Sequence, residues 1–199
     1  MKSNVCKIEK GINDLDAILK ESERVAEYNG LSHKQALQLR LLCEEIDGML
    51  PNIIDDFKGE LWIDFDNGVC KVNVNIQIPD FNMSKKEELI NVAKNKKNSA
   101  AVGIVGKIRN AIENFFLNDS MMDSFTMSTG TLGIATGGID GVDYAYFWRL
   151  DEYRSYVRQE DKKEAWDELE KSVIASLADD VTVGIKGNRA QIVVVKKFA

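Results

Sequence analysis

The strongest constraint in this sequence is a run of alternating side chains that directly follows an Asn67-Gly68 pair. Alternation with a period of two predicts a strand that buries one face and turns the other toward polar surroundings. An Asn-Gly pair between two β-forming runs predicts a hairpin of 60–65 with 69–78, because both turn residues accept positive φ. The apolar positions of the second strand are Val72, Val74, Ile76 and Ile78.

Helical spacing of apolar residues dominates the chain on both sides of this hairpin. Two of the helical segments begin with a capping box, at Ser32 and at Ser84. Pro51 is expected to kink or interrupt the second helix, which then continues for a short stretch to Gly59. The predicted helical segments are 12–28, 32–50, 84–98, 101–116 and 161–177.

A second hairpin is predicted near the end of the sequence, from 181–185 and 191–195, and 144–150 is predicted to be a strand. Helices, a hairpin, further helices and a further hairpin indicate an α+β fold, a two-layer sandwich of helices on a mostly antiparallel sheet. No repeat or low-complexity linker divides the 199 residues. We therefore expect a single domain over 1–199, with an inserted or mobile segment at 118–142.

Charge and composition exclude several classes of protein. The net charge is −6, from 26 basic and 32 acidic residues, which argues against a nucleic-acid-binding protein. Apolar stretches end well before the roughly 18 residues of a membrane span, and the first residues lack an apolar leader. We therefore expect a cytoplasmic protein that binds neither nucleic acid nor membrane.

The cysteines predict no metal site. Cys6, Cys43 and Cys70 are odd in number and widely spaced, and the chain has a single histidine. No Cys-x-x-Cys pair exists, so a zinc constellation is not expected. Because Cys43 and Cys70 fall in apolar patterns, we interpret the cysteines as small core residues.

The segment 39–49 carries the most informative carboxylates. It reads Leu-Arg-Leu-Leu-Cys-Glu-Glu-Ile-Asp-Gly-Met, and on a helix Glu45 lies at the edge of the apolar stripe. A carboxylate at such an edge is partly desolvated, which suits a general base. The alternative is that Glu44, Glu45 and Asp47 form a solvated acidic surface of the helix.

This helix and the hairpin after it resemble the histidine-kinase-like ATPase superfamily (Bergerat fold), and most closely its anti-sigma-factor serine kinases. In that family a helix with Glu-x-x-x-Asn precedes a hairpin, and the second strand ends in Asp-x-Gly-x-Gly. By this resemblance Glu45 matches the glutamate that activates the attacking water, and Asp80 matches the aspartate that binds the adenine amino group. The similar order of elements covers roughly residues 12–115.

The resemblance also implies where phosphates and magnesium would lie. Gly103 and Gly106 correspond to the glycines at which helix amides meet phosphates. Met49 stands where the family has its magnesium-binding asparagine, and a thioether is a poor ligand for a hard cation. Asn82 and Ser84 replace the glycines after the adenine aspartate. We therefore expect ATP as a ligand, and we predict no metal site.

The function implied by the resemblance is that of a bacterial ATP-binding regulatory protein, an anti-sigma-like switch with weak or lost kinase activity. Such a protein would act on a regulatory protein partner, and it could form a homodimer. The alternative is a non-enzymatic protein-interaction module that keeps the fold without binding nucleotide. Its contact surface would be a sheet edge or the aromatic segment 144–156.

Overall fold

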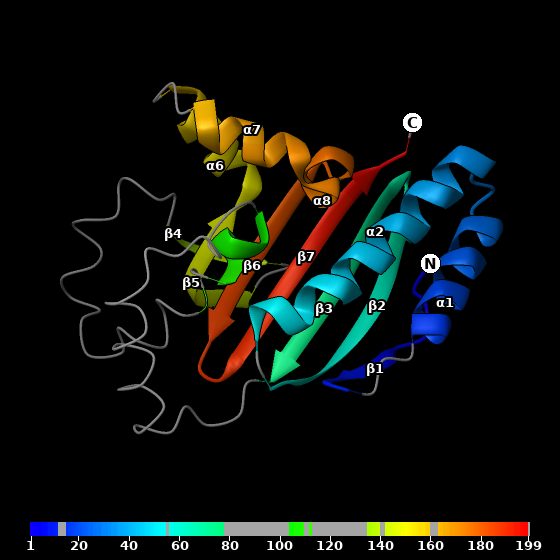
Figure 1. Ribbon diagram of the computed structural model, residues 1–199. Coiled ribbons are helices and arrows are strands. Elements are labelled where there is room, and N and C mark those ends of the chain that lie inside the picture. Colours follow the sequence, from blue (N-terminus) through cyan, green and yellow to red (C-terminus); the bar gives the residue numbers. More distant parts are fainter. Residues whose placement is uncertain are drawn as a thin grey trace.

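The computed structural model has the expected two-layer α+β architecture, with helices on one face of a seven-stranded antiparallel sheet (Figure 1). Asp80, Gly103, the predicted helix 84–98 and most of 118–142 lie outside the described residues. From 118–142 the structure describes 135–139 and 142, which belong to strands of this sheet. The described residues are 1–11, 15–54, 56–77, 104–109, 112, 135–139, 142–159 and 163–198.

The strands pair in the order β1-β2-β3-β7-β6-β5-β4, and every neighbouring pair is antiparallel. β7 is the last strand along the chain and lies at the centre of the sheet. The edge strand β1 was not predicted from the sequence. The bounds are β1 Cys6–Glu9, β2 Lys58–Asp66, β3 Val69–Gln77, β4 Ala135–Ile139, β5 Val142–Arg149, β6 Asp180–Lys186 and β7 Arg189–Lys197.

The predicted Asn-Gly hairpin is confirmed. Asn67 has φ +48° and Gly68 has φ +78°, which are the positive values that a tight turn between β2 and β3 requires. The turn also touches the end of β7, because the Phe198 N–H donates to the Gly68 carbonyl (2.7 Å). The ring of Phe198 stacks on Phe65 at a centroid distance of 6.3 Å. The turn therefore joins the first hairpin to the last strand.

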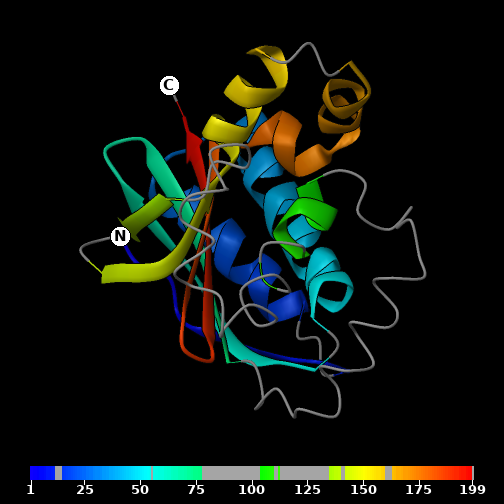
Figure 2. The same cartoon turned by 90° about the vertical axis from the view of Figure 1, so that its left-hand side faces the viewer.

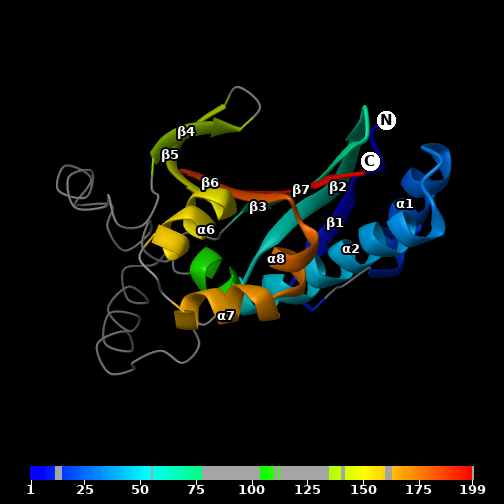
Figure 3. The same ribbon diagram turned by 90° about the horizontal axis from the view of Figure 1, so that it is seen from above.

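The helices of the described residues lie together on one side of the sheet, while β4 and β5 bend toward the other side (Figures 2 and 3). None of these helices combines the length and hydrophobicity that crossing a bilayer would require. The capping box at the start of α2 is confirmed, with Ser32 N–H donating to Gln35 Oε1 (2.9 Å). The bounds are α1 Leu15–Tyr28, α2 His33–Ile53, helix 104–109, α6 Leu150–Gln159, α7 Lys163–Lys171 and α8 Val173–Leu177.

The prediction that Pro51 interrupts its helix was wrong. α2 runs through Pro51 to Ile53, and Ile54 closes the helix by donating its N–H to the Leu50 carbonyl (3.1 Å). Proline removes one backbone donor, and in the final turn this costs a single hydrogen bond. The predicted helical continuation toward Gly59 reaches only Ile53, and β2 begins at Lys58.

The strand predicted at 144–150 is confirmed as β5, which ends at Arg149, and the aromatic segment 144–156 continues from β5 into α6. The expected helix 161–177 is two helices, and Ser172 separates them by capping α8 through its Oγ, which accepts from Ala175 N–H (3.2 Å). A serine can satisfy the free amides of a new helix in this way.

The core lies between the sheet and the helices, as the alternation predicted. Val72, Val74 and Ile76 are buried on the helix side. The opposite face is less solvated than expected, because Asn73 is only 1% exposed. Its amide donates to Asp64 Oδ2 (3.0 Å), and the same oxygen accepts from Trp62 Nε1 (2.8 Å). The buried amide of Asn73 is therefore hydrogen-bonded to the neighbouring strand.

The three cysteines are free and buried, which agrees with their interpretation as core residues. Cys6 lies on β1, Cys43 on α2 and Cys70 on β3. Burial raises the pKa of the Cys43 thiol far above its ordinary value and raises the pKa of Cys70 to about 12. The thiols of Cys43 and Cys70 are therefore protonated and weakly nucleophilic in the folded protein.

We expect Gly59→Ala to destabilise the protein, because β2 and β3 approach closely at this position. A Cβ on Gly59 would lie 2.2 Å from the Asn75 carbonyl oxygen, so backbone must move. The expected loss in the free energy of unfolding is about 1–3 kcal/mol, measured by urea denaturation. The matched control is Gly48→Ala in α2, where a Cβ meets nothing within 4 Å and should add about 0.5–1 kcal/mol. Equal effects of the two variants would contradict this assignment.

Candidate functional site

A groove on the helix side of the molecule lies where α2 passes helix 104–109 and α8. Its volume is about 460 Å³. The three walls come from parts of the chain that are far apart in sequence, and polar and apolar side chains are both present. The lining residues are Glu44, Glu45, Gly48, Met49, Asn52, Ile104, Val105, Lys171, Ser172, Val173 and Ile174.

Glu45 is the carboxylate of α2 that is available to a ligand in this groove. It is half-buried, and it forms no hydrogen bond or ion pair with any residue that the structure describes. Its neighbour Glu44 is instead paired with Arg40 (Nε to Oε1, 3.2 Å), and Arg40 also binds Glu23 of α1. Because the Glu44 carboxylate is paired with Arg40, the Glu45 carboxylate is the more available acceptor for a hydrogen-bond donor in the groove.

Gly48 keeps the α2 wall of the groove open. The position is exposed in mid-helix, and a Cβ there would meet no atom within 4 Å. Glycine costs a helix interior about 0.5–1 kcal/mol relative to alanine, and no packing contact of the folded chain requires it. No contact among the described residues therefore requires a glycine at this position, and the absence of a side chain leaves room beside Glu45.

The opposite wall is the junction of α7 and α8. Lys171, the last residue of α7, is exposed and contributes a positive charge to the rim. Arg154 of α6 holds the other end of α8, where its guanidinium binds the carbonyls of Ala175, Ala178 and Asp179. With Ser172 capping its start, α8 is fixed at both ends, which makes this wall a defined surface.

The structure brings together some of the residues that the sequence singled out. Glu45 and helix 104–109 border the same groove. Gly106, however, is buried within that helix and does not line the groove. Asp80 and Gly103 lie outside the described residues, so their nucleotide-binding roles stay predictions. Gly48 and Lys171 were not singled out, because their importance depends on contacts across the fold.

The side chains of the groove do not fit a magnesium ion. Met49 presents a thioether, which Mg²⁺ does not favour. The nearest amide, Asn52, donates to the Gly48 carbonyl (3.1 Å) and lies seven residues from Glu45, about 10 Å along the helix. The described residues contain no cluster of three potential His, Cys, Asp or Glu ligands. The described side chains of the groove therefore do not provide a magnesium site.

Asp47 lies beside the groove residues but is not part of a solvated acidic surface, contrary to one interpretation of the sequence. Its residue is 6% exposed, and it has no hydrogen-bond or ion-pair partner among the described residues. Burial raises the pKa of the Asp47 carboxyl above its ordinary value of 3.8. An unpaired buried carboxylate of this kind is a cost to folding.

Comparison of the chain with protein-family models, with curated proteins and with solved structures gives no match. The groove and its residues are therefore the basis for a functional proposal.

We expect Asp47→Asn to stabilise the protein at neutral pH. The folded state holds a proton on Asp47 more tightly than the unfolded chain, so stability falls as the pH rises from 3.8 through the folded pKa. The amide has no charge to bury, so its advantage over wild type should be greatest at pH 7 and narrow as the pH falls toward 3.8.

Urea denaturation at several pH values measures this difference. Glu27→Gln, on the exposed side of α1, removes the same charge without burial and serves as the control. An advantage of Asp47→Asn that stays constant with pH would show that desolvation of the carboxylate is not its cause.

Proposed function

We propose that the groove between α2, helix 104–109 and α8 binds a nucleotide such as ATP, and that the protein is a regulatory protein of the histidine-kinase-like ATPase type. One observation carries the proposal. The unpartnered carboxylate of Glu45 and the ammonium group of Lys171 border one groove, on separate walls, with apolar surface and the open space at Gly48 between them.

Each part of the groove suits one part of a nucleotide. The half-buried side chains of Val105 and Val173 offer an apolar surface for a base, because ligand sites are mostly apolar with a few placed polar groups. Lys171 offers a positive charge to a phosphate. Glu45 can accept a hydrogen bond from a ribose hydroxyl, a water or the hydroxyl of a protein substrate.

The same groove supports the view that kinase activity is weak or lost. Glu45 retains the character of a general base, since its carboxylate is half-buried and unpaired in the described structure. Phosphoryl transfer also needs cations to neutralise the charge that develops on the phosphate oxygens. The side chains of this groove do not form a magnesium site, so we propose that nucleotide binding serves to switch a partner protein and not to turn over ATP rapidly.

Thermal unfolding with ATP or ADP, each with magnesium or with a chelator, tests the proposal. A ligand at 100 times its dissociation constant stabilises a protein by about 2.7 kcal/mol, which for a chain of this size raises the midpoint on the order of 5–10 °C. We expect the rise with chelator present. Absence of a rise with any nucleotide would overturn the proposal.

Gly48→Leu should abolish the nucleotide-induced rise, because its side chain would occupy the space beside Glu45. Gly48→Ala is the matched control for the loss of glycine, and it should raise the midpoint of the free protein while keeping most of the response to nucleotide. Asp80→Asn tests the adenine role that the family resemblance gives to Asp80. An unchanged response in Gly48→Leu would show that the nucleotide binds elsewhere.

The alternative, an interaction module without nucleotide, would be favoured if no nucleotide shifts the midpoint. Within the aromatic segment 144–156, Trp148 is a poor choice for testing a partner surface. Trp148 is 4% exposed and packs against Tyr153 at a centroid distance of 6.2 Å. Trp148→Ala would therefore report on the core, and a test of partner binding needs residues on an exposed edge.

A further inference from the structure

The edge strand β1 offers backbone groups that no described strand pairs with. It is the first strand in the sheet order, and β2 is its only neighbour among the described strands (Figure 1). The free stretch begins after Asn4, whose N–H already donates to Glu21 of α1 (2.8 Å). An open edge of this kind is a template for a further strand.

A backbone hydrogen bond just after β1 shows which of its residues point their N–H and C=O groups toward β2. Lys10 N–H donates to the Phe57 carbonyl (3.3 Å), and Lys10 and Phe57 continue the register in which Ile8 pairs with Gly59. Residues alternate between pointing their N–H and C=O toward a neighbour and away from it. The backbone groups of Ile8 therefore point to β2, and those of Lys7 and Glu9 point to the free edge.

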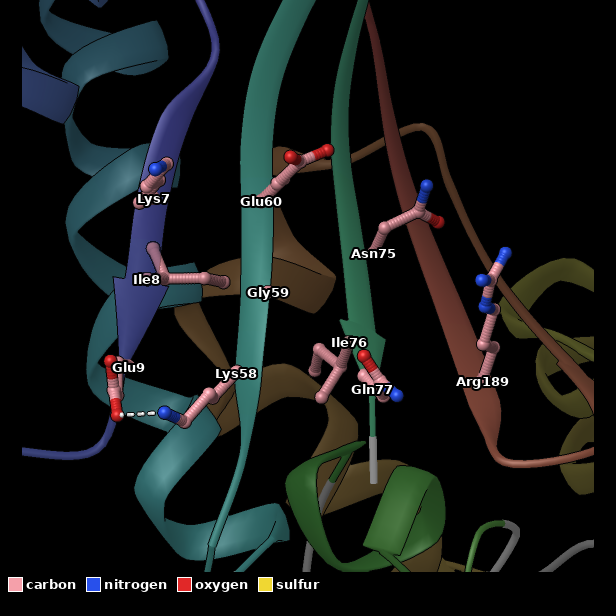
Figure 4. A pocket seen from close by; sticks show the side chains of 10 residues that line it. All are labelled: Lys7, Ile8, Glu9, Lys58, Gly59, Glu60, Asn75, Ile76, Gln77 and Arg189. Carbon is pink, nitrogen blue, oxygen red and sulfur yellow. Dashed lines mark ion pairs between the residues drawn. The ribbon is translucent and has the colours of Figure 1, made fainter. Parts of the chain in front are cut away.

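The side chains of Lys7 and Glu9 lie on the face of the sheet that the helices leave open. In register with them on β2 are Glu60, opposite Lys7, and Lys58, opposite Glu9. Glu9 and Lys58 form an ion pair (2.9 Å), whereas Lys7 and Glu60 form none in the described structure. Figure 4 shows these side chains around a shallow hollow of about 670 Å³. On this face, β1 carries Lys7 and Glu9, and β2 carries Glu60 and Lys58, so each residue lies opposite one of the other charge.

We propose that β1 pairs antiparallel with β1 of a second copy of this chain, about a two-fold axis at Ile8, to form one continuous sheet across a homodimer. This pairing sets Lys7 of each copy opposite Glu9 of the other. The backbone groups of both residues point to the free edge, so each such pair exchanges two hydrogen bonds. The proposal is independent of nucleotide binding.

The charges of Lys7 and Glu9 favour a two-fold axis at Ile8 over an axis shifted by one residue. A two-fold axis at Lys7 would set two lysines opposite each other, and an axis at Glu9 would set two glutamates opposite each other, which is destabilising. With the axis at Ile8, each row across the interface alternates in sign, from Lys58 and Glu9 of one copy to Lys7 and Glu60 of the other. Edge lysines ordinarily discourage strand pairing, and here the glutamate of an identical strand removes that barrier.

Charge reversal followed by mixing tests the pairing. Lys7→Glu leaves four glutamates at the centre of its own dimer, and Glu9→Lys leaves four lysines. Each variant alone should raise the dimer dissociation constant by about tenfold or more, from two opposite-charge contacts turned into like-charge ones. An equimolar mixture of the two variants sets glutamate opposite lysine at every position, and it should recover the dimer.

Sedimentation equilibrium of the full chain measures these masses, at concentrations up to about 200 μM because a contact this short belongs to the weak class of interfaces. Any repulsion within a single copy, such as that between Lys58 and the lysine introduced by Glu9→Lys, is the same in the mixture as in the separate variants. Recovery on mixing therefore reports the contact between copies. Lys34→Glu, on the exposed first turn of α2, is the control and should leave the mass unchanged.

Three results would overturn the proposal. A wild-type chain that stays monomeric at the highest concentration does not pair through β1. A dimer that both charge reversals leave intact uses a different surface, and the same conclusion follows if both variants are monomeric and their mixture remains so.

Discussion

The ladder between β3 and β7 is the interaction on which the rest of the molecule depends. It joins strands that are more than a hundred residues apart, from Val69 opposite Lys197 to Gln77 opposite Arg189. Without it the sheet would separate into β1-β2-β3 and β7-β6-β5-β4. The groove depends on the same ladder, because α2 is connected to the first group of strands and α8 to the second. A candidate site built across that division exists only when both groups share one sheet, so the ladder supports both the stability of the fold and the groove.

The parts of the fold that were predictable from the sequence are those that local patterns determine. Both hairpins follow from period-two alternation and turn residues, and α2 begins where its capping box indicates. Predictions failed where tertiary contacts determine the secondary structure of a segment. β1 has four residues, too few for a pattern, and it is a strand because β2 lies beside it. α6 carries aromatic residues that favour strands, yet the burial of Tyr153 and Val157 on one side of a helix outweighs that preference.

The candidate site was predictable only in part, for a similar reason. The edge position of Glu45 could be derived from the apolar stripe of its own helix. Lys171 could not, because its place opposite Glu45 results from the β3–β7 ladder and from the arginine that holds α8. Gly48 is visible in the sequence as a glycine in a helical pattern, and only the empty space around it gives that glycine a meaning. Asp47 shows where helical periodicity fails to predict burial. The pattern allowed it to lie on a solvated surface with Glu44 and Glu45, but the folded protein buries it.

The three buried thiols make the molecule its own reporter of local opening. One lies on the edge strand, one in the helix layer and one in the interior of the sheet. Because all three are buried, an alkylating reagent should modify each of them mainly when its surroundings open. The order in which Cys6, Cys43 and Cys70 become reactive under mildly denaturing conditions would therefore give the order in which edge, helices and central sheet come apart. Each thiol marks a different part of the same fold.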